Sequence, residues 1–259
     1  MYPQHRLSSS GLVVLLQQWM QADAGVAARL DVGLDVAEQM GQGLSTVEAV
    51  TLSRSLHAIE SFAQDAATGE RVDVPALEQA VQRAKAELTE LACAPPARAR
   101  PVRERADNTR AQAPDLKAEG EFGFHAPRYL GLQKQLDARL LALRSQVRQG
   151  LAQGPRALRQ LAALDAVMEQ LTCVREQRLW ASLPVHLDKR LVQLRTAHQQ
   201  RLAALGQTDE PLRWRDPGGW LTVFERDLQA LLLAEMHVRM QPITGLLEAA
   251  RNENMERQE

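Results

Sequence analysis

The feature that most constrains the fold is a set of long apolar stripes in residues 122–259. Leu and Ala dominate this region, and large apolar side chains recur at steps of three or four residues, as on one face of an α-helix. The first stripe comprises Leu136, Leu140, Leu143, Val147 and Leu151. No stretch of the chain alternates apolar and polar residues as a half-buried strand would. The sequence therefore predicts an all-α fold.

Three further stripes follow the first. They comprise Leu161, Leu164, Met168, Leu171 and Leu179; Leu187, Leu191, Leu194, Leu202 and Leu205; and Leu221, Phe224, Leu228, Leu232, Met236, Met240, Ile243 and Leu247. Short breaks at residues 153–155, 182–184 and 206–219 predict an antiparallel four-helix bundle, because short connections join antiparallel neighbours. Pro184 has no glycine beside it, so the second and third stripes can instead form one kinked helix within an elongated helical coiled coil.

Residues 1–93 predict a smaller region of about four helical segments. Serines 8–10 can cap a helix that carries Leu12, Leu15, Leu16 and Trp19, and a short helix is expected from Asp31 to about Met40. Ser45 and Glu48 form a capping-box pattern, and the helix that follows is expected to bury Leu52, Leu56 and Ile59. Asp73 and Pro75 begin the fourth segment, whose stripe is Leu77, Val81, Ala84, Leu88 and Leu91.

Residues 94–121 are rich in proline and charge, and Val102 and Leu116 are their only large aliphatic side chains. Such a segment buries too little apolar surface to offset its chain entropy, so we expect a disordered linker. The predicted division is therefore an N-terminal helical region (1–93), a Pro/Arg-rich linker (94–121) and a C-terminal long-helix region (122–259). The first region has six basic and twelve acidic residues and the last has 19 and 15, which favours either docking between the two regions or binding to different partners.

The whole chain is nearly neutral, with 31 basic and 32 acidic residues, so no global charge attracts it to nucleic acid or anionic lipid. Cys93 and Cys173 are its only cysteines and neither belongs to a CxxC motif, which suits a reducing compartment. The N-terminal apolar run "GLVVLL" is too short for a secretion signal, and no run of about 20 uncharged apolar residues is present. We therefore expect a cytoplasmic protein without a transmembrane segment.

Residues 231–250, "LLLAEMHVRMQPITGLLEAA", place charged side chains in an otherwise apolar stretch. In a helix, Glu235 and His237 point about 200° apart and cannot bind one metal, whereas Glu235 and Arg239 are spaced as an i, i+4 ion pair. His237 is expected at the flank of the apolar stripe. Pro242 should kink or end the helix, and the segment after it either folds back on its own bundle or docks on a partner. The candidate partner-binding residues are Met236, Met240, Ile243, Leu246 and Leu247.

Signals for catalysis or metal binding are weak. No histidine follows a carboxylate by three residues, HExxH is missing, and His198 on the third stripe is interpreted as a core or interface histidine. "GQGLST" at 41–46 lacks the strand and lysine of a phosphate-binding loop and is interpreted as a turn. We expect no catalytic, cofactor-binding or metal-binding residues, no cofactor and no enzymatic activity.

Two basic clusters remain. Arg98, Arg100, Arg103 and Arg105 are candidate anion contacts, but acidic residues dilute them and no aromatic residue lies between them, so nucleic acid is the less favoured partner. Arg213 and Arg215 flank Trp214, which is expected to cover the end of the bundle, while Asp216 and Pro217 are expected to begin the last helix.

Five blocks of the sequence together resemble a known family. They are "SSSGLVVLL", "VEAVTLSRSL", "PRYLGLQKQLDARLLALRSQVRQGLA", "LAALDAVMEQLTCVREQRLWASLP" and "LLLAEMHVRMQPITGLLEAA". The chain is similar to the proteobacterial domain-of-unknown-function family three-three-four-eight. The resemblance implies an all-helical cytoplasmic protein with no assigned catalytic residues. It further implies a link to a proton-driven envelope complex, since relatives tend to be encoded near a membrane protein resembling flagellar-stator and TolQ-type proton channels, with an OmpA-like companion.

The leading functional hypothesis is a non-enzymatic helical scaffold or adaptor that mediates protein–protein interaction, with the envelope complex as the partner that the resemblance implies. Homo-oligomerisation is compatible with the same apolar stripes. The alternative hypothesis is a nucleic-acid-associated regulatory protein that uses the linker arginines.

Overall fold

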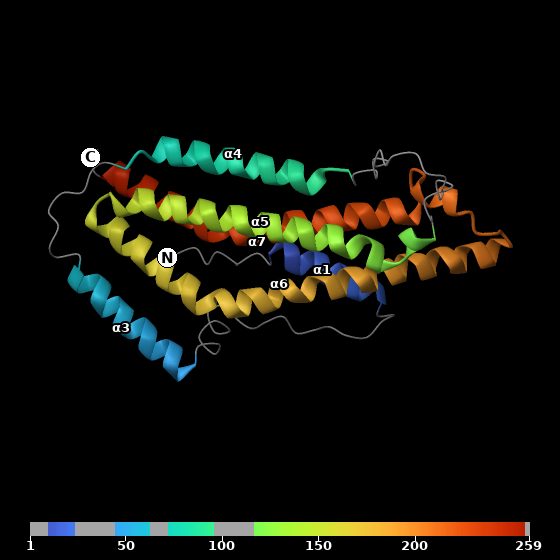
Figure 1. Ribbon diagram of the computed structural model, residues 1–259, viewed down its shortest axis with the longest axis horizontal. Coiled ribbons are helices and arrows are strands. Elements are labelled where there is room, and N and C mark those ends of the chain that lie inside the picture. Colours follow the sequence, from blue (N-terminus) through green and yellow to red (C-terminus); the bar gives the residue numbers. More distant parts are fainter. Residues whose placement is uncertain (1–9, 24–44, 63–71, 96–116, 257–259) are drawn as a thin grey trace, which may run out of the picture. The chain divides into compact units, whose positions relative to one another are not determined.

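A computed structural model describes residues 10–23, 45–62, 72–95 and 117–256 (Figure 1). These residues form helices and no strand, which confirms the all-α prediction. The helices are α1 (Gly11–Asp23), α3 (Thr46–Phe62), α4 (Val74–Cys93), η1 (Ala118–Gly120), α5 (Phe122–Ala152), α6 (Arg156–Leu205), η2 (Pro211–Arg215) and α7 (Trp220–Glu256). The helix predicted between Asp31 and Met40 lies outside the described residues.

Three of the helices begin at the caps that the sequence predicts. The Ser10 hydroxyl accepts a hydrogen bond from the Val13 N–H at 3.4 Å, and the Asp73 carboxylate accepts one from the Ala76 N–H at 3.0 Å. At α3, the Glu48 N–H donates to the Ser45 hydroxyl at 3.3 Å and the Ser45 N–H donates to the Glu48 carboxylate at 2.7 Å. Each cap satisfies N–H groups that a helix start leaves without a partner inside the helix.

Neither Pro184 nor Pro242 ends its helix. α6 runs through Pro184 for 50 residues, so the predicted break at residues 182–184 is wrong and the single-helix alternative describes this segment. Trp180, Leu183 and Leu187 are buried at the spacing of one helix face, and continuous burial on both sides of the proline offsets its lost hydrogen bond. α7 likewise continues past Pro242 to Glu256, with Ile243 and Leu246 buried just beyond it.

The contacts divide the chain into two compact units. Unit 1 comprises residues 1–23, 86–137 and 182–238, and unit 2 comprises residues 24–85, 138–181 and 239–259. Each unit therefore contains one segment of each of α4, α5, α6 and α7. The described part of region 122–259 has three long helices rather than four, because α6 spans two predicted stripes, and α4 comes from the predicted N-terminal region. The division into sequence-contiguous domains stays a prediction.

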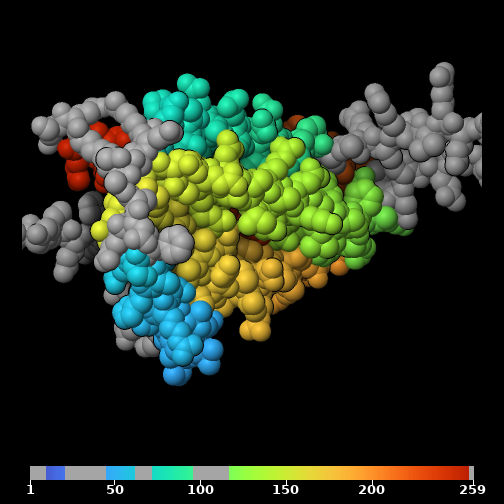
Figure 2. Space-filling model, turned by 60° about the vertical axis from the view of Figure 1, so that its left-hand side comes forward, coloured from blue at the N-terminus to red at the C-terminus, as the bar shows by residue number. Residues whose placement is uncertain are grey.

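In unit 2, α4 lies along α5 (Figure 2). A Cβ atom at Gly150 would meet the Leu77 side chain at 3.1 Å, and one at Gly154 would collide with Val72, so glycine permits this close approach. On α5, Arg144 donates two hydrogen bonds to the Asp165 carboxylate of α6, at 2.9 and 2.7 Å. These partly buried bidentate contacts pair the two consecutive helices.

Ion pairs also join the acidic N-terminal region to the basic C-terminal region, as their opposite charges led us to expect. In unit 2, the Arg175 guanidinium lies 2.7 Å from the Glu48 carboxylate, and Arg251 pairs with Glu78. Both pairs are at least partly exposed, so each stabilises the fold only modestly.

In unit 1, α1 packs on α6 through Trp19, whose ring is buried. The Arg190 guanidinium lies 5.9 Å from the centre of this ring, and the Gln193 amide donates to the Trp19 carbonyl at 3.5 Å. η1 falls inside the predicted disordered linker, so at least residues 118–120 of that segment are ordered, with Gly120 buried against Trp214. None of the described helices is long and apolar enough to span a bilayer.

A proline-to-alanine pair tests the continuity of α6 and α7. Because proline costs about 3 kcal/mol more than alanine inside a helix, Pro184→Ala and Pro242→Ala should each raise the free energy of unfolding by up to about 3 kcal/mol. Pro75→Ala is the matched control, since Pro75 lies in the first turn of α4, where the ring is tolerated. Chemical denaturation followed by circular dichroism measures the change. A loss of stability in both internal variants would contradict uninterrupted helices.

Candidate functional site

Glu235 on α7 is fully buried, and its carboxylate is held by α5. The Tyr129 hydroxyl donates to it at 3.1 Å, and the Gln133 amide donates to its two oxygens at 3.1 and 3.3 Å. Tyr129 and Gln133 are four residues apart, so α5 presents both donors on one face. A buried carboxylate needs such donors, because its charge loses the solvation of water.

Glu235 lies in a helix, as predicted, but its burial was not predicted. The Arg239 guanidinium lies 4.5 Å from the centre of the Trp180 ring in unit 2, and the expected i, i+4 pair of Glu235 with Arg239 stays a prediction. A signal was present, because Glu235 continues the three- and four-residue steps of the buried residues Leu228, Leu231 and Leu232. His237 is exposed, in agreement with its predicted place at the flank of the stripe.

A second buried polar cluster joins α5 to α7 in unit 1. The Arg128 guanidinium lies 2.6 Å from one oxygen of Glu225, and the ring Nδ1 of His125 lies 3.4 Å from the other. The Nε2 atom of His125 lies 2.8 Å from the carbonyl oxygen of Glu119. Burial raises the pKa of Glu225, but the contacts with His125 and Arg128 outweigh it and hold that pKa below its ordinary value.

The two clusters define the direction in which the helices pair. Arg128 precedes Gln133 along α5. Their acceptors occur in the same order along α7, since Arg128 contacts Glu225 and Gln133 contacts Glu235. The two segments therefore run in the same direction within unit 1. Polar contacts at buried positions are costly to misalign, so these clusters specify the register of the two helices. We interpret both clusters as structural sites that fix the pairing of α5 with α7.

Aromatic side chains gather at the start of α7. The ring centres of Trp214 and Trp220 lie 5.1 Å apart. Both side chains are buried, in agreement with the expected covering role of Trp214. The Asp209 carboxylate accepts from the Trp214 indole at 2.7 Å and lies 3.1 Å from His198. Although burial raises the pKa of Asp209, these two hydrogen bonds lower it overall.

The predicted start of α7 is wrong by a few residues. Asp216 ends η2, and the Val223 N–H donates to the Gly219 carbonyl, so Gly219 rather than Asp216 precedes the helix. A Cβ atom at Gly219 would collide with the carbonyls of Arg213 and Trp214, which explains the glycine at this turn.

The remaining candidate residues fall into two groups. The chain itself buries Met236, Met240, Ile243, Leu246 and Leu247, so they offer no exposed docking face and the segment after Pro242 packs within its own unit. Arg98, Arg100, Arg103 and Arg105 lie outside the described residues, as does most of "GQGLST". Among the described residues, no group of three His, Cys, Asp or Glu side chains is placed to hold a metal ion.

Helix α3 carries exposed apolar side chains on more than one side, and the exposure of this helix was not predicted. None of its residues 46–61 is buried, and Val47, Val50 and Leu56 are 75%, 45% and 38% exposed (Figure 2). Leu52, Leu56 and Ile59 were all expected to be buried. Leu56 is exposed, and Leu52 and Ile59 are half-buried. The apolar residues of α3 are spread around the helix, so one packed face cannot cover all of them.

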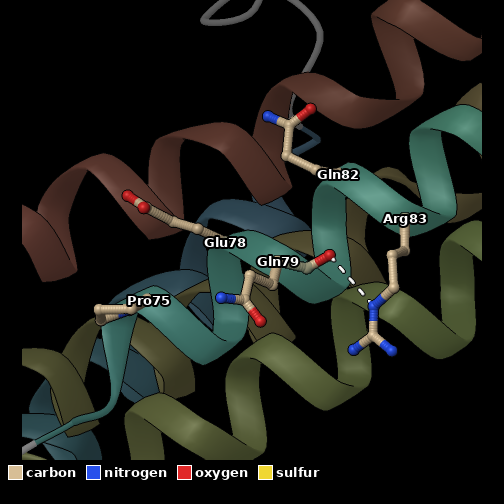
Figure 3. A pocket seen from close by; sticks show the side chains of 5 residues that line it. All are labelled: Pro75, Glu78, Gln79, Gln82 and Arg83. Carbon is tan, nitrogen blue, oxygen red and sulfur yellow. Dashed lines mark hydrogen bonds between the residues drawn. The ribbon is translucent and has the colours of Figure 1, made fainter.

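An open pocket of about 590 Å³ lies on α4 (Figure 3). Its described lining residues are Pro75, Glu78, Gln79, Gln82 and Arg83. The Arg83 guanidinium turns back to donate to the Gln79 carbonyl at 3.4 Å. Because the described lining comes from one helix and Glu78 is paired with Arg251, we assign no ligand to this pocket.

Truncating Glu235 tests the buried hydrogen-bond network. Glu235→Ala leaves the Tyr129 hydroxyl and the Gln133 amide without this acceptor, and we expect the free energy of unfolding to fall by about 3 kcal/mol. Glu248→Ala, at an exposed position of the same helix, should change it by less than about 0.5 kcal/mol. Equal effects of the two substitutions in urea denaturation would contradict the network.

The lowered pKa of Glu225 predicts a pH dependence of stability. A carboxyl group with a lowered folded-state pKa stabilises the fold above its ordinary pKa of 4.5 and loses that contribution as the pH falls. The stability difference between the native chain and Glu225→Gln should therefore be largest near neutral pH and shrink below about pH 4.5. Denaturation curves across this range measure it, and a difference that grows on acidification would contradict the assignment.

Comparison with known proteins identifies a family but no characterised relative. No curated protein and no solved structure matches the sequence significantly. A family model described as "Protein of unknown function (DUF3348)" matches residues 1–252, which covers nearly the whole chain and confirms the resemblance seen in the sequence blocks. The chain belongs to this family of proteins of unknown function.

Proposed function

We propose that the chain is a non-enzymatic helical scaffold or adaptor that presents α3 to a protein partner. The exposure of α3 is the observation that carries this proposal. A helix of 17 residues is marginally stable in water without tertiary cover, yet none of residues 46–61 is buried. Exposed apolar side chains on such a helix are typical of surfaces that a partner covers.

The attachment of α3 leaves one face free to bind. Leu52 and Ile59 are half-buried, and Glu48 pairs with Arg175 of α6. Val47, Val50 and Arg54 fall within about 60° on a different face of the helix. We therefore propose that this outer face of α3, defined by Val47, Val50 and Arg54, is the binding surface.

The charge on this face indicates the chemistry of the partner. Arg54 and His57 lie on or beside it, whereas Glu48 projects toward Arg175. A partner helix that carries apolar and acidic side chains fits such a surface, because apolar contacts give affinity and opposite charges give specificity. The resemblance to relatives encoded beside a proton-channel-like membrane protein makes a proton-driven envelope complex the first candidate partner. A cytoplasmic location is part of this proposal.

Paired aspartate substitutions test the binding surface. The native chain, a Val47→Asp/Val50→Asp variant and a Leu212→Asp control are used as baits in native cell extract, and captured proteins are identified by mass spectrometry. Leu212 is 78% exposed on η2 and is therefore a matched apolar surface position. We expect the native chain and the control to capture the same partner in equal amounts. The double variant should capture at least about tenfold less of this partner.

A captured protein supports the proposal only if it binds the purified native chain directly and if this binding depends on Val47 and Val50. Equal capture by all three baits, or recovery of the native chain alone from soluble and membrane fractions, would contradict an adaptor role for α3.

A further inference from the structure

Helix α3 docks on unit 2 through one narrow face. Among its residues 46–61, four are half-buried and the others are exposed. The four step by 4, 3 and 4 positions and therefore lie within about 60° around the helix. They are Glu48, Leu52, Ser55 and Ile59, and we call them the α3 inner seam. Because two of them are polar and none is fully buried, docking removes little apolar surface from water.

An ion pair at one end of the α3 inner seam connects it to α6. The Glu48 carboxylate lies 2.7 Å from the Arg175 guanidinium, and the two side chains are 28% and 40% exposed. Within the described part of the chain, no other residue of α3 forms an ion pair with another element. Water and salt reach both charges, so this contact is weak and can open reversibly.

The start of α3 is held by contacts that do not involve α6. The Ser45 N–H donates to the Glu48 carboxylate, and the Ser45 hydroxyl accepts from the Glu48 N–H. Hydrogen bonds with Ser45, followed by the charge of Arg175, hold the pKa of Glu48 below its ordinary value, so this carboxylate is charged at neutral pH. Because the capping contacts are local, they can persist when α3 separates from α6.

We propose that α3 is a releasable arm and that the ion pair between Glu48 and Arg175 controls its docking on unit 2. An acidic side chain of a partner can take the place of Glu48 at Arg175. The released helix then presents Leu52 and Ile59 to that partner in addition to its outer face. This regulatory role rests on the proposed function, whereas release itself is a property of the chain alone.

Hydrogen–deuterium exchange of the full chain, followed by mass spectrometry of its peptides, tests the release of α3. Glu48→Gln removes one charge but keeps an acceptor for the cap, and Arg175→Gln removes the other charge. Each should speed exchange within residues 46–61 by about two- to fivefold, the range that one exposed ion pair supports. Both together should have no larger effect than either alone, because each breaks the same contact. Glu78→Gln breaks the ion pair of α4 with Arg251 and, as the matched control, should leave exchange of α3 unchanged.

Spin labels separate release from unwinding of the helix. With Cys93 and Cys173 replaced by serine, labels at Ser53→Cys on α3 and Gln170→Cys on α6 report the distance between the two helices by double electron–electron resonance. Both labelled positions are exposed and belong to unit 2. Added salt or Glu48→Gln should increase a population at longer distance, because either weakens the ion pair. An unchanged distance distribution under both conditions would overturn release.

Partner capture distinguishes this inference from the proposed function. Glu48→Gln should capture about two- to fivefold more partner than the native chain, because docking on unit 2 no longer competes with binding. Faster exchange of α3 without this gain would overturn the regulatory role and leave the adaptor proposal standing. Equal exchange of α3 in the native chain and in both single variants would overturn the releasable arm, whatever partner is captured.

Discussion

Burial of one apolar face of α7 along its whole length stabilises both compact units. Leu221, Phe224, Leu228, Leu232, Met236, Met240, Ile243 and Leu247 are all buried along this helix. The face contributes to both compact units, because the first half of α7 belongs to unit 1 and the end of α7 to unit 2. Burial of each such side chain stabilises the fold by about 2 kcal/mol, which together far exceeds the cost of one internal proline. This explains why α7 continues through Pro242.

Apolar burial alone would leave the register of the helices poorly specified. In unit 1, two carboxylates on α7 specify the register, since the partly buried Glu225 and the fully buried Glu235 each accept contacts from α5. A shift of α5 by one turn would separate both carboxylates from the donors that α5 supplies. The same reasoning explains the role of residues 231–250: Glu235 aligns α7 with α5, and Met236 and Met240 are buried in the interior.

The surface of α3 differs in character from the packed interior. Its outer face combines two exposed valines with Arg54. These are ordinary surface residues in an unusual combination, and the face does not depend on a reactive group.

The helical class, the caps at Ser10, Ser45 and Asp73, and the buried faces of α5 and α7 could be predicted from the sequence, because caps and periodicity depend on residues within a few positions of each other. Three features required the packed fold: the continuity of α6 through Pro184, the exposure of Leu56, and the burial of Glu235 beside donors from α5. These features depend on which elements face one another across more than a hundred positions. Periodicity within one helix identifies its buried face but cannot identify the neighbouring side chain that contacts it.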